Sequence, residues 1–173
     1  INNYDLTKYA LDNEATKFIK EGYNIIGLRF GTVNGWSPNT REELMINSMT
    51  KKSIIEKKIC VNNKFIKRPI LGINDISRAM KVIIDNPVSG IYNLASFVDT
   101  VHNISSQVSN ILGSDIHETM NVAGSYDFIM DTNKFCKTYN FTFNQTVESI
   151  VDEITIKFDK TTFTDRNKFI KYG

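Results

Sequence analysis

Residues 4–35 decide the fold, and they read YDLTKYALDNEATKFIKEGYNIIGLRFGTVNG. Apolar residues recur at helical spacing between positions 5 and 20, which predicts a helix over that range. Gly22 is expected to end this helix, because glycine readily adopts the left-handed conformation found after helices. The nearly continuous apolar run over 24–30 predicts a strand buried on both faces. A helix, a glycine turn and a buried strand in this order are typical of an α/β fold.

The rest of the chain predicts further short helices and strands. Residues 31–39 are rich in turn-forming residues and predict a loop. Thr40 is then expected to cap a helix to Lys52, with Glu43 completing a capping box. The expected strands are a hairpin of 59–61 with 65–66, a strand over 90–95 and a strand over 117–122. The expected helices are one over 76–85 capped by Asn74 or Asp75, one from Thr100 to Leu112 closed by Gly113, one to Tyr139 capped by Asp131, and one over 146–158. A loose tail is expected after 160.

The composition is that of an ordinary globular protein. Of the 173 residues, 41% are hydrophobic and 23% are charged, and the formal net charge is only +2. The basic residues form no concentrated stripe, so a nucleic-acid partner is not expected. There is no apolar run of about 18 residues and no signal peptide, so we expect no membrane association and a cytoplasmic location. The chain begins at Ile1 rather than at methionine, which suggests a fragment, a processed product or a truncated reading frame.

Cysteine and histidine residues do not suggest a metal site. Cys60 and Cys136 are far apart and form neither a disulfide framework nor a ligand cluster. Their apolar surroundings predict reduced residues of the core. His102 and His117 have no ligand-type neighbour at metal-binding spacing except Glu118, so both are interpreted as structural or exposed.

Tyr4 and Lys8 are four residues apart, so they share one face of the predicted helix. An ammonium close to a phenol favours the phenolate and lowers a tyrosine pKa from about 10 toward neutrality. Such a tyrosine can take or give a proton at a hydroxyl or carbonyl while a nicotinamide accepts or returns hydride. The alternative is an exposed surface pair, because this spacing also arises by chance.

An ordered set of short motifs continues from this pair. Tyr4, Lys8 and Asp12 precede a strand that contains Leu28-Arg29 and runs on to Val33-Asn34-Gly35. Further along come Ser37-Pro38, Arg41, Asn47, Arg68-Pro69, Asn74-Asp75, Ala79, the strand Gly90 to Leu94 and the helix start Asp131 to Lys134. This order resembles the extended short-chain dehydrogenase/reductase family, in its nucleotide-sugar epimerase and dehydratase branch. The resemblance covers about residues 4–155.

The resemblance implies an α/β chain that is the C-terminal part of a Rossmann-like doubly wound parallel sheet, joined to a small mixed α/β substrate-binding lobe. Residues 1–36 and 73–113 would be the remainder of the dinucleotide-binding domain. Residues 37–72 and 114–160 would form the substrate-binding lobe, and 161–173 a tail.

The resemblance also implies roles for the residues around the cofactor. Tyr4 would be the catalytic acid/base, and Lys8 would tune it and hold the nicotinamide ribose of NAD, with NADP left open. Thr32 and Val33 would line the nicotinamide side. Many sugar epimerases carry asparagine at the position of Thr32 and Tyr-Gly-Pro at Asn34-Gly35-Trp36, and these departures leave the substrate open.

On the substrate side, the resemblance implies that Thr32, Asn47 and Arg68 contact a nucleotide-sugar. An arginine fork suits a diphosphate because it is always charged and can bind two oxygens. The alternatives are a surface charge at a strand start for Arg68 and a polar residue on an exposed helix face for Asn47. Trp36 could stack on a base or sugar, although packing beneath its own loop is the simpler interpretation.

The function implied is that of a fragment of an NAD(P)-dependent epimerase or dehydratase acting on a nucleotide-diphosphate sugar. In the family, a phosphate-cradling glycine loop precedes the tyrosine, whereas only three residues precede Tyr4 here. The fragment alone is therefore expected to be inactive, and a homodimer of the parent enzyme is left open. Two alternatives remain: a non-catalytic partner or regulatory protein that keeps the fold, and a reductase of a small non-nucleotide carbonyl.

Overall fold

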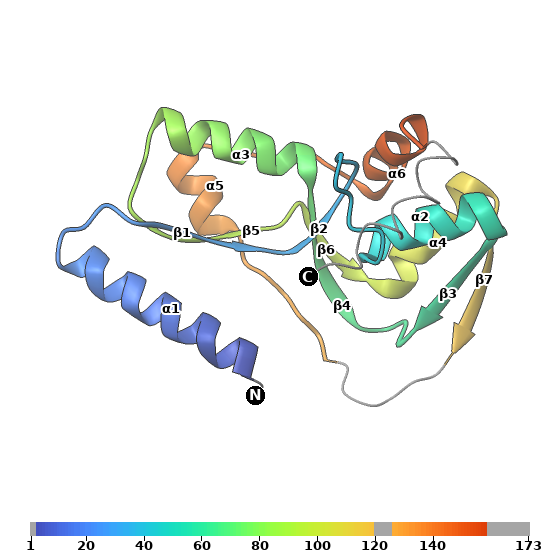
Figure 1. The fold of residues 1–173 in the computed structure, drawn as a ribbon, viewed down its shortest axis with the longest axis horizontal. Coiled ribbons are helices and arrows are strands. Elements are labelled where there is room, and N and C mark those ends of the chain that lie inside the picture. Colours follow the sequence, from blue (N-terminus) through green and yellow to red (C-terminus); the bar gives the residue numbers. More distant parts are fainter. Residues whose placement is uncertain (1–2, 120–125, 159–173) are drawn as a thin grey trace.

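The computed structural model describes residues 3–119 and 126–158. Helices and strands alternate along most of the chain, as expected for an α/β protein (Figure 1). The elements are α1 (Asn3–Lys20), β1 (Ile26–Phe30), β2 (Thr32–Asn34), α2 (Met45–Glu56), β3 (Lys58–Asn62), β4 (Lys67–Gly72), α3 (Ile73–Asp85), β5 (Gly90–Leu94), β6 (Phe97–Thr100), α4 (Val101–Leu112), β7 (Asp115–Thr119), α5 (Asn133–Tyr139) and α6 (Val147–Ile156).

Strand pairing is mostly parallel and joins segments far apart in sequence. Strand β1 pairs in parallel with β5, and β3 pairs in parallel with β7. Strand β4 lies between β2, to which it is parallel, and β6, to which it is antiparallel. Parallel strands need long crossover connections, and helices supply most of them here. The predicted α/β fold class is therefore confirmed.

Two hydrophobic clusters form the core. The first lies between α2, α4 and α6 and the strands β3 and β4, and contains Ile46, Met49, Ile59, Val61, Ile70, Val101, Ile104, Val108, Val147, Ile150, Val151 and Ile154. The second joins β4 and β5 to α3 and α5, and contains Leu71, Ala79, Ile83, Tyr92, Leu94, Phe135 and Phe141. Helix α4 packs with α2 and α6, whereas α5 packs with β5.

A buried carboxylate connects the two clusters. Asp75, in the first turn of α3, is fully buried. It accepts hydrogen bonds from the backbone N–H groups of Asn144 (3.2 Å) and Gln145 (3.0 Å) and from the Ser96 hydroxyl (2.7 Å), and it pairs with Arg78 (2.6 Å). These partners come from the connection between α5 and α6, the turn after β5, and α3 itself. Asp75 therefore fixes the point where the chain crosses from one cluster to the other.

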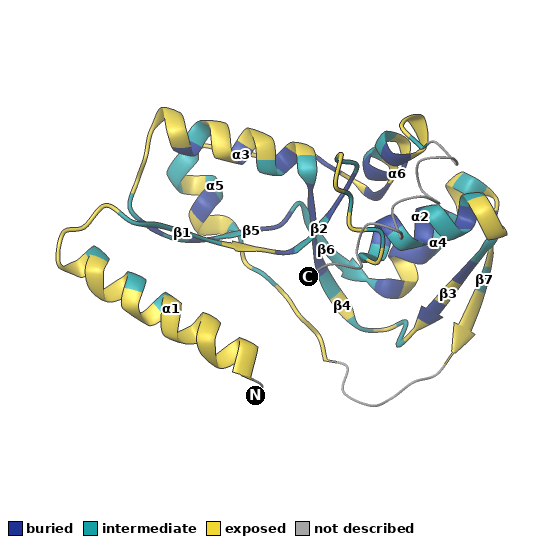
Figure 2. Cartoon of the chain, viewed as in Figure 1, coloured by how far each residue is buried: buried dark blue, intermediate teal, exposed yellow. Residues whose placement is uncertain are grey.

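Helix α1 lies on the surface and no residue of it is buried. Its half-buried positions face β1 and β5, whereas the rest of the helix is exposed (Figure 2). Exposed apolar side chains include Leu6 (51%), Leu11 (62%) and Phe18 (39%). Gly22 follows the helix with φ +94°, so the predicted glycine stop is confirmed.

The expectation that the strand over 24–30 is buried on both faces is wrong for β1. Its first three residues are half-buried, and Arg29 and Phe30 are exposed. Within the described ranges, β1 has β5 as its one strand partner, and α1 covers it only loosely. An apolar run indicates that a strand can be buried on both faces, but the helices and strands packed against it determine how much of its surface is buried.

Several local predictions were wrong because distant segments compete with local signals. The hairpin around 62–64 does not form, because β3 pairs with β7 instead. Thr40 does not cap a helix, since its hydroxyl bonds Ser37 and α2 begins later, after Leu44. Residues 32–34, predicted as loop, form β2. Cys60 is an exposed residue of β3 rather than a core residue.

The helices with strong end signals were predicted correctly. Helix α4 begins after Thr100, whose hydroxyl accepts from the Asn103 N–H, and ends at Gly113 in the left-handed conformation. Helix α6 begins after Thr146, which forms a capping box with Ser149. The predicted tail lies outside the described residues, as does the end of the strand predicted over 117–122. No helix in the described ranges is long and apolar enough to cross a bilayer.

Candidate active site

The candidate acid/base pair lies on the exposed first half of α1. The Lys8 ammonium nitrogen is 5.3 Å from the centroid of the Tyr4 ring, so the two side chains meet on one helix face as predicted. The Tyr4 side chain is 68% exposed, which leaves the phenol open to a ligand. Among the described residues, no hydrogen bond or ion pair joins Tyr4 or Lys8 to the other predicted site residues.

An ion pair fastens α1 to the sheet. The Arg29 guanidinium of β1 donates through Nε and Nη2, both at 2.8 Å, to one carboxylate oxygen of Asp12. Asp12 lies one helical turn after Lys8 and two turns after Tyr4, on the same face. The sequence pattern includes both charged residues, but it does not reveal that they pair.

Strand β2 holds the two residues predicted beside the cofactor. Thr32 and Val33 are half-buried, and they lie opposite Ile70 and Leu71 of β4. Val33 also packs against the second core cluster. Arg68 precedes Ile70 by two residues, so it is about 7 Å from the level of Thr32 along the strands. The parallel β2–β4 pair therefore brings Thr32 and Arg68 to neighbouring levels of one sheet.

Asn47 is buried and its amide is used within the fold. Its oxygen accepts from the Gly35 N–H at 2.9 Å, and its nitrogen donates to the Arg41 carbonyl at 3.0 Å. Asn34 supports the same region, because its oxygen accepts from the Ile46 N–H at 2.9 Å. These contacts lock the loop after β2 onto the start of α2. The alternative interpretation of Asn47, a polar residue on an exposed helix face, is therefore wrong.

Arg68 contacts the segment that leads into α5. Its Nη1 donates to the Tyr126 carbonyl at 2.6 Å, and its guanidinium lies 5.6 Å from the centroid of the Tyr126 ring. The Lys67 N–H donates to Asp127 at 2.8 Å, which fixes the same segment to the start of β4. No local sequence signal indicates this contact, since 58 residues separate Arg68 from Tyr126.

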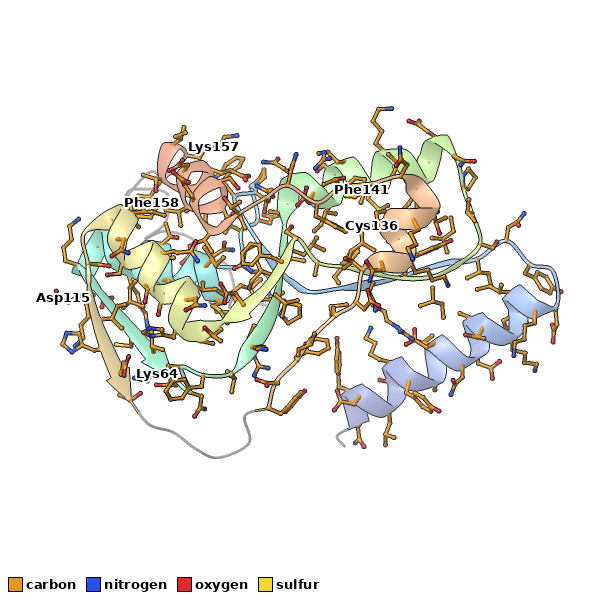
Figure 3. The ribbon with its side chains drawn as sticks, turned by 180° about the vertical axis from the view of Figure 1, so that it is seen from behind. Lys64, Asp115, Cys136, Phe141, Lys157 and Phe158 are labelled. Atoms are coloured by element: carbon orange, nitrogen blue, oxygen red, sulfur yellow. The ribbon has the colours of Figure 1, made fainter. Side chains whose placement is uncertain are left out.

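A small apolar cavity of about 260 Å³ lies apart from the predicted site. Its walls are formed by Val61, Asn63, Lys64, Phe65, Ile66, Glu118 and Thr119. Figure 3 shows Lys64 at the end of β3, where its ammonium pairs with Glu118 at 2.6 Å. None of the predicted site residues lines this cavity.

Other polar residues also have structural partners. Trp36 packs against the first cluster, and the Lys157 ammonium lies 4.5 Å from the centroid of its ring. Packing near its own loop therefore describes Trp36 better than an open stacking platform. In the part of the chain that the structure describes, no group of three histidine, cysteine or acidic residues could hold a metal ion.

Comparisons with known proteins relate the fold to a group of enzymes. No protein-family model matches the sequence, and no curated protein matches it. The UDP-glucose 4-epimerase of Thermotoga maritima, solved with UDP-glucose, has a TM-score of 0.77 at 17% identity; the match covers 94% of this chain and 55% of the epimerase. The dTDP-glucose 4,6-dehydratase of Bacillus anthracis, solved with NAD, has a TM-score of 0.76 at 18% identity, covering 91% and 53%.

A third enzyme gives the same result. The UDP-N-acetylglucosamine 4-epimerase of Bacillus cereus has a TM-score of 0.73 at 23% identity, covering 88% of this chain and 55% of that one. The chain thus spans about half the length of the solved proteins it matches. It has the α/β fold found in these nucleotide-sugar epimerases and dehydratases.

Proposed function

We propose that this chain forms the acid/base helix and the sugar-nucleotide lobe of an NAD(P)-dependent epimerase, dehydratase or reductase that acts on a nucleotide-diphosphate sugar. The observation that carries the proposal is the Lys8 ammonium 5.3 Å from the Tyr4 ring, on the exposed face of the helix that leads into β1. The shared fold with sugar-nucleotide enzymes supports it.

Tyr4 would move a proton at a sugar hydroxyl or carbonyl oxygen. Lys8 would hold the ribose of the dinucleotide through its N–H donors. The backbone of Thr32 and Val33 would line the nicotinamide side. When bound, the nicotinamide supplies the acceptor and donor of hydride. The exposed Tyr4–Lys8 face fits such a group, because both polar ends are open to a ligand.

Arg68 would bind the diphosphate of the substrate. One of the five N–H donors of a guanidinium goes to the Tyr126 carbonyl, which would orient the group. The remaining donors can form the paired bonds to phosphate oxygens that arginine favours. Asn47 would act by shaping the loop after β2, since its amide is already bonded to Gly35 and Arg41.

The phosphate-cradling layer of the enzyme would cover β1 and α1. Within the described residues β1 pairs with β5 alone, so its other edge has no strand partner there, and proteins normally pair or cover such an edge. The apolar side chains exposed on α1 are consistent with a further layer packed there. We therefore propose that this chain lacks turnover by itself and gains it when that cofactor-binding layer is present.

Turnover of Tyr4→Phe tests the proposal in the enzyme assembled from this chain and its cofactor-binding layer. Conversion of UDP- and dTDP-linked glucose should fall by about 100-fold or more, because loss of a positioned acid/base typically costs 10²–10⁴-fold. Tyr9→Phe is the matched control, since Tyr9 lies on the same helix with 67% exposure against 68% for Tyr4. Equal activities of the two variants would rule out the role of Tyr4.

A non-catalytic partner or regulatory protein is the second candidate. The observation that favours it is that Asn47 and Arg68 both bond to groups of this chain. In that case the assembled protein would bind the nucleotide yet show no turnover, and Tyr4→Phe would change nothing. A reductase of a small carbonyl would instead turn over without affinity for uridine or thymidine diphosphate.

A further inference from the structure

We infer that the Asp12–Arg29 ion pair is a positioning device that holds the helix carrying Tyr4 and Lys8 against the sheet. This inference rests on the proposed function, because it concerns how that acid/base pair is held. Both charged groups are partly exposed, with side-chain exposures of 47% for Arg29 and 32% for Asp12. The pair joins a helix to a strand, since Asp12 belongs to α1 and Arg29 to β1.

The direction of the two elements gives the pair its effect. Helix α1 and strand β1 run in roughly opposite directions, connected by a short turn, and the start of α1 lies farther from β1 than its end does (Figure 1). The ion pair fixes one point of contact between the two elements, at Asp12 and Arg29. The start of α1, which carries Tyr4 and Lys8, extends beyond this contact.

The rise of the helix places the acid/base pair relative to this contact. Lys8 lies four residues before Asp12, or about 6 Å along the helix, and Tyr4 lies about 12 Å before it. Both residues lie on the same helix face as Asp12. A shift of α1 at the ion pair would therefore be carried along the helix to both side chains.

The packing of α1 explains why an ion pair is needed. No residue of α1 is buried, so few apolar contacts oppose sliding or tilting of the helix. The two N–H donors of Arg29 meet one carboxylate oxygen at equal distances, which restrains the direction of approach. Asp12 and Arg29 are positioning residues, since neither would touch the reacting atoms.

Hydrogen exchange of the chain itself provides the first test. In Asp12→Asn and Arg29→Gln, amides of residues 4–12 should exchange about two- to fivefold faster, the range expected for a partly exposed ion pair. Glu14→Gln is the control, because it removes the same charge from an exposed position of α1. The charge swap Asp12→Arg with Arg29→Asp should restore the protection of these amides from exchange. High salt should remove the difference in exchange rate between the variants and the unsubstituted chain.

Kinetics of the assembled enzyme provide the second test. Asp12→Asn should lower kcat about tenfold with KM for the nucleotide-sugar unchanged, because small misplacements of a catalytic group are costly. The charge swap should recover kcat. The inference would be overturned if Asp12→Asn changed neither the amide exchange rates of residues 4–12 nor kcat. It would also be overturned if the charge swap restored neither quantity. If the parent protein itself shows no turnover, the proposed function fails, and the exchange experiment still decides whether the pair holds α1.

Discussion

Removing the Asp75 carboxylate should destabilise the whole chain, because it ties three segments at one buried point. The Gln145 N–H is buried and would lose its acceptor in Asp75→Ala, which costs about 2 kcal/mol for an unsatisfied buried donor. Loss of the Ser96 hydrogen bond adds about 1 kcal/mol. Arg78 and the Asn144 N–H can reach water, so their loss adds little. We therefore expect a decrease of about 3–4 kcal/mol in the free energy of unfolding.

Denaturant unfolding followed by two probes measures this change. Trp36 is the single tryptophan and packs on the first cluster, so its fluorescence reports that cluster while circular dichroism reports all helices. Asp75→Asn should lose about half as much stability, since it keeps one acceptor oxygen. Asp85→Asn is the matched control on the same helix: its pair with Lys81 is exposed and worth less than about 0.5 kcal/mol. A loss below about 1 kcal/mol in Asp75→Ala would refute the reasoning.

Three further changes test the packing and the caps. Burial is the main cause that raises the pKa of Tyr92, and the neighbouring Tyr139 is the second. Because this tyrosine ionises at lower pH in the unfolded chain than in the folded one, stability should fall above about pH 10. Tyr92→Phe should reduce that fall in thermal melts. Gly72→Ala should cost about 1–3 kcal/mol in denaturant unfolding, because its Cβ would overlap the Gln145 side chain, and adding Gln145→Ala should recover part of the loss. Thr146→Ala should cost about 1 kcal/mol by the same assay, because it removes the cap of α6.

Local signals predicted the helices well because capping is a short-range interaction. Thr100 caps the start of α4 and Gly113 caps its end, each through contacts within five residues. The local sequence is therefore enough to predict both ends of this helix. The same holds for Thr146 in α6. Thr40 also has a capping residue type, but its hydroxyl bonds to Ser37, a competing turn that residue type cannot reveal.

Strand pairing was harder to predict because it depends on distant segments. The partner of β3 is β7, more than 50 residues later in the chain, whereas the sequence suggested a partner within five residues. An edge strand and a central strand can share one apolar pattern, which explains why β1 is more exposed than predicted.

In the candidate site, too, short-range contacts were predicted and long-range contacts were not. The contact between Lys8 and Tyr4 follows from helical spacing and was predicted. The contacts of Asn47, Arg68 and Asp12 involve segments 6 to 58 residues away and were not. The roles of Tyr4, Lys8, Thr32 and Arg68 toward a ligand stay predictions until they are measured.

Reduced nicotinamide formed in a single turnover tests the central claim most directly. The enzyme assembled from this chain and its cofactor-binding layer is mixed with NAD and UDP-glucose, and the absorbance of the reduced nicotinamide is followed. The parent protein and Tyr9→Phe should produce the transient absorbance, whereas Tyr4→Phe should bind NAD and produce none. A transient of normal size and rate in Tyr4→Phe would contradict the assignment of the proton-transfer role to this phenol.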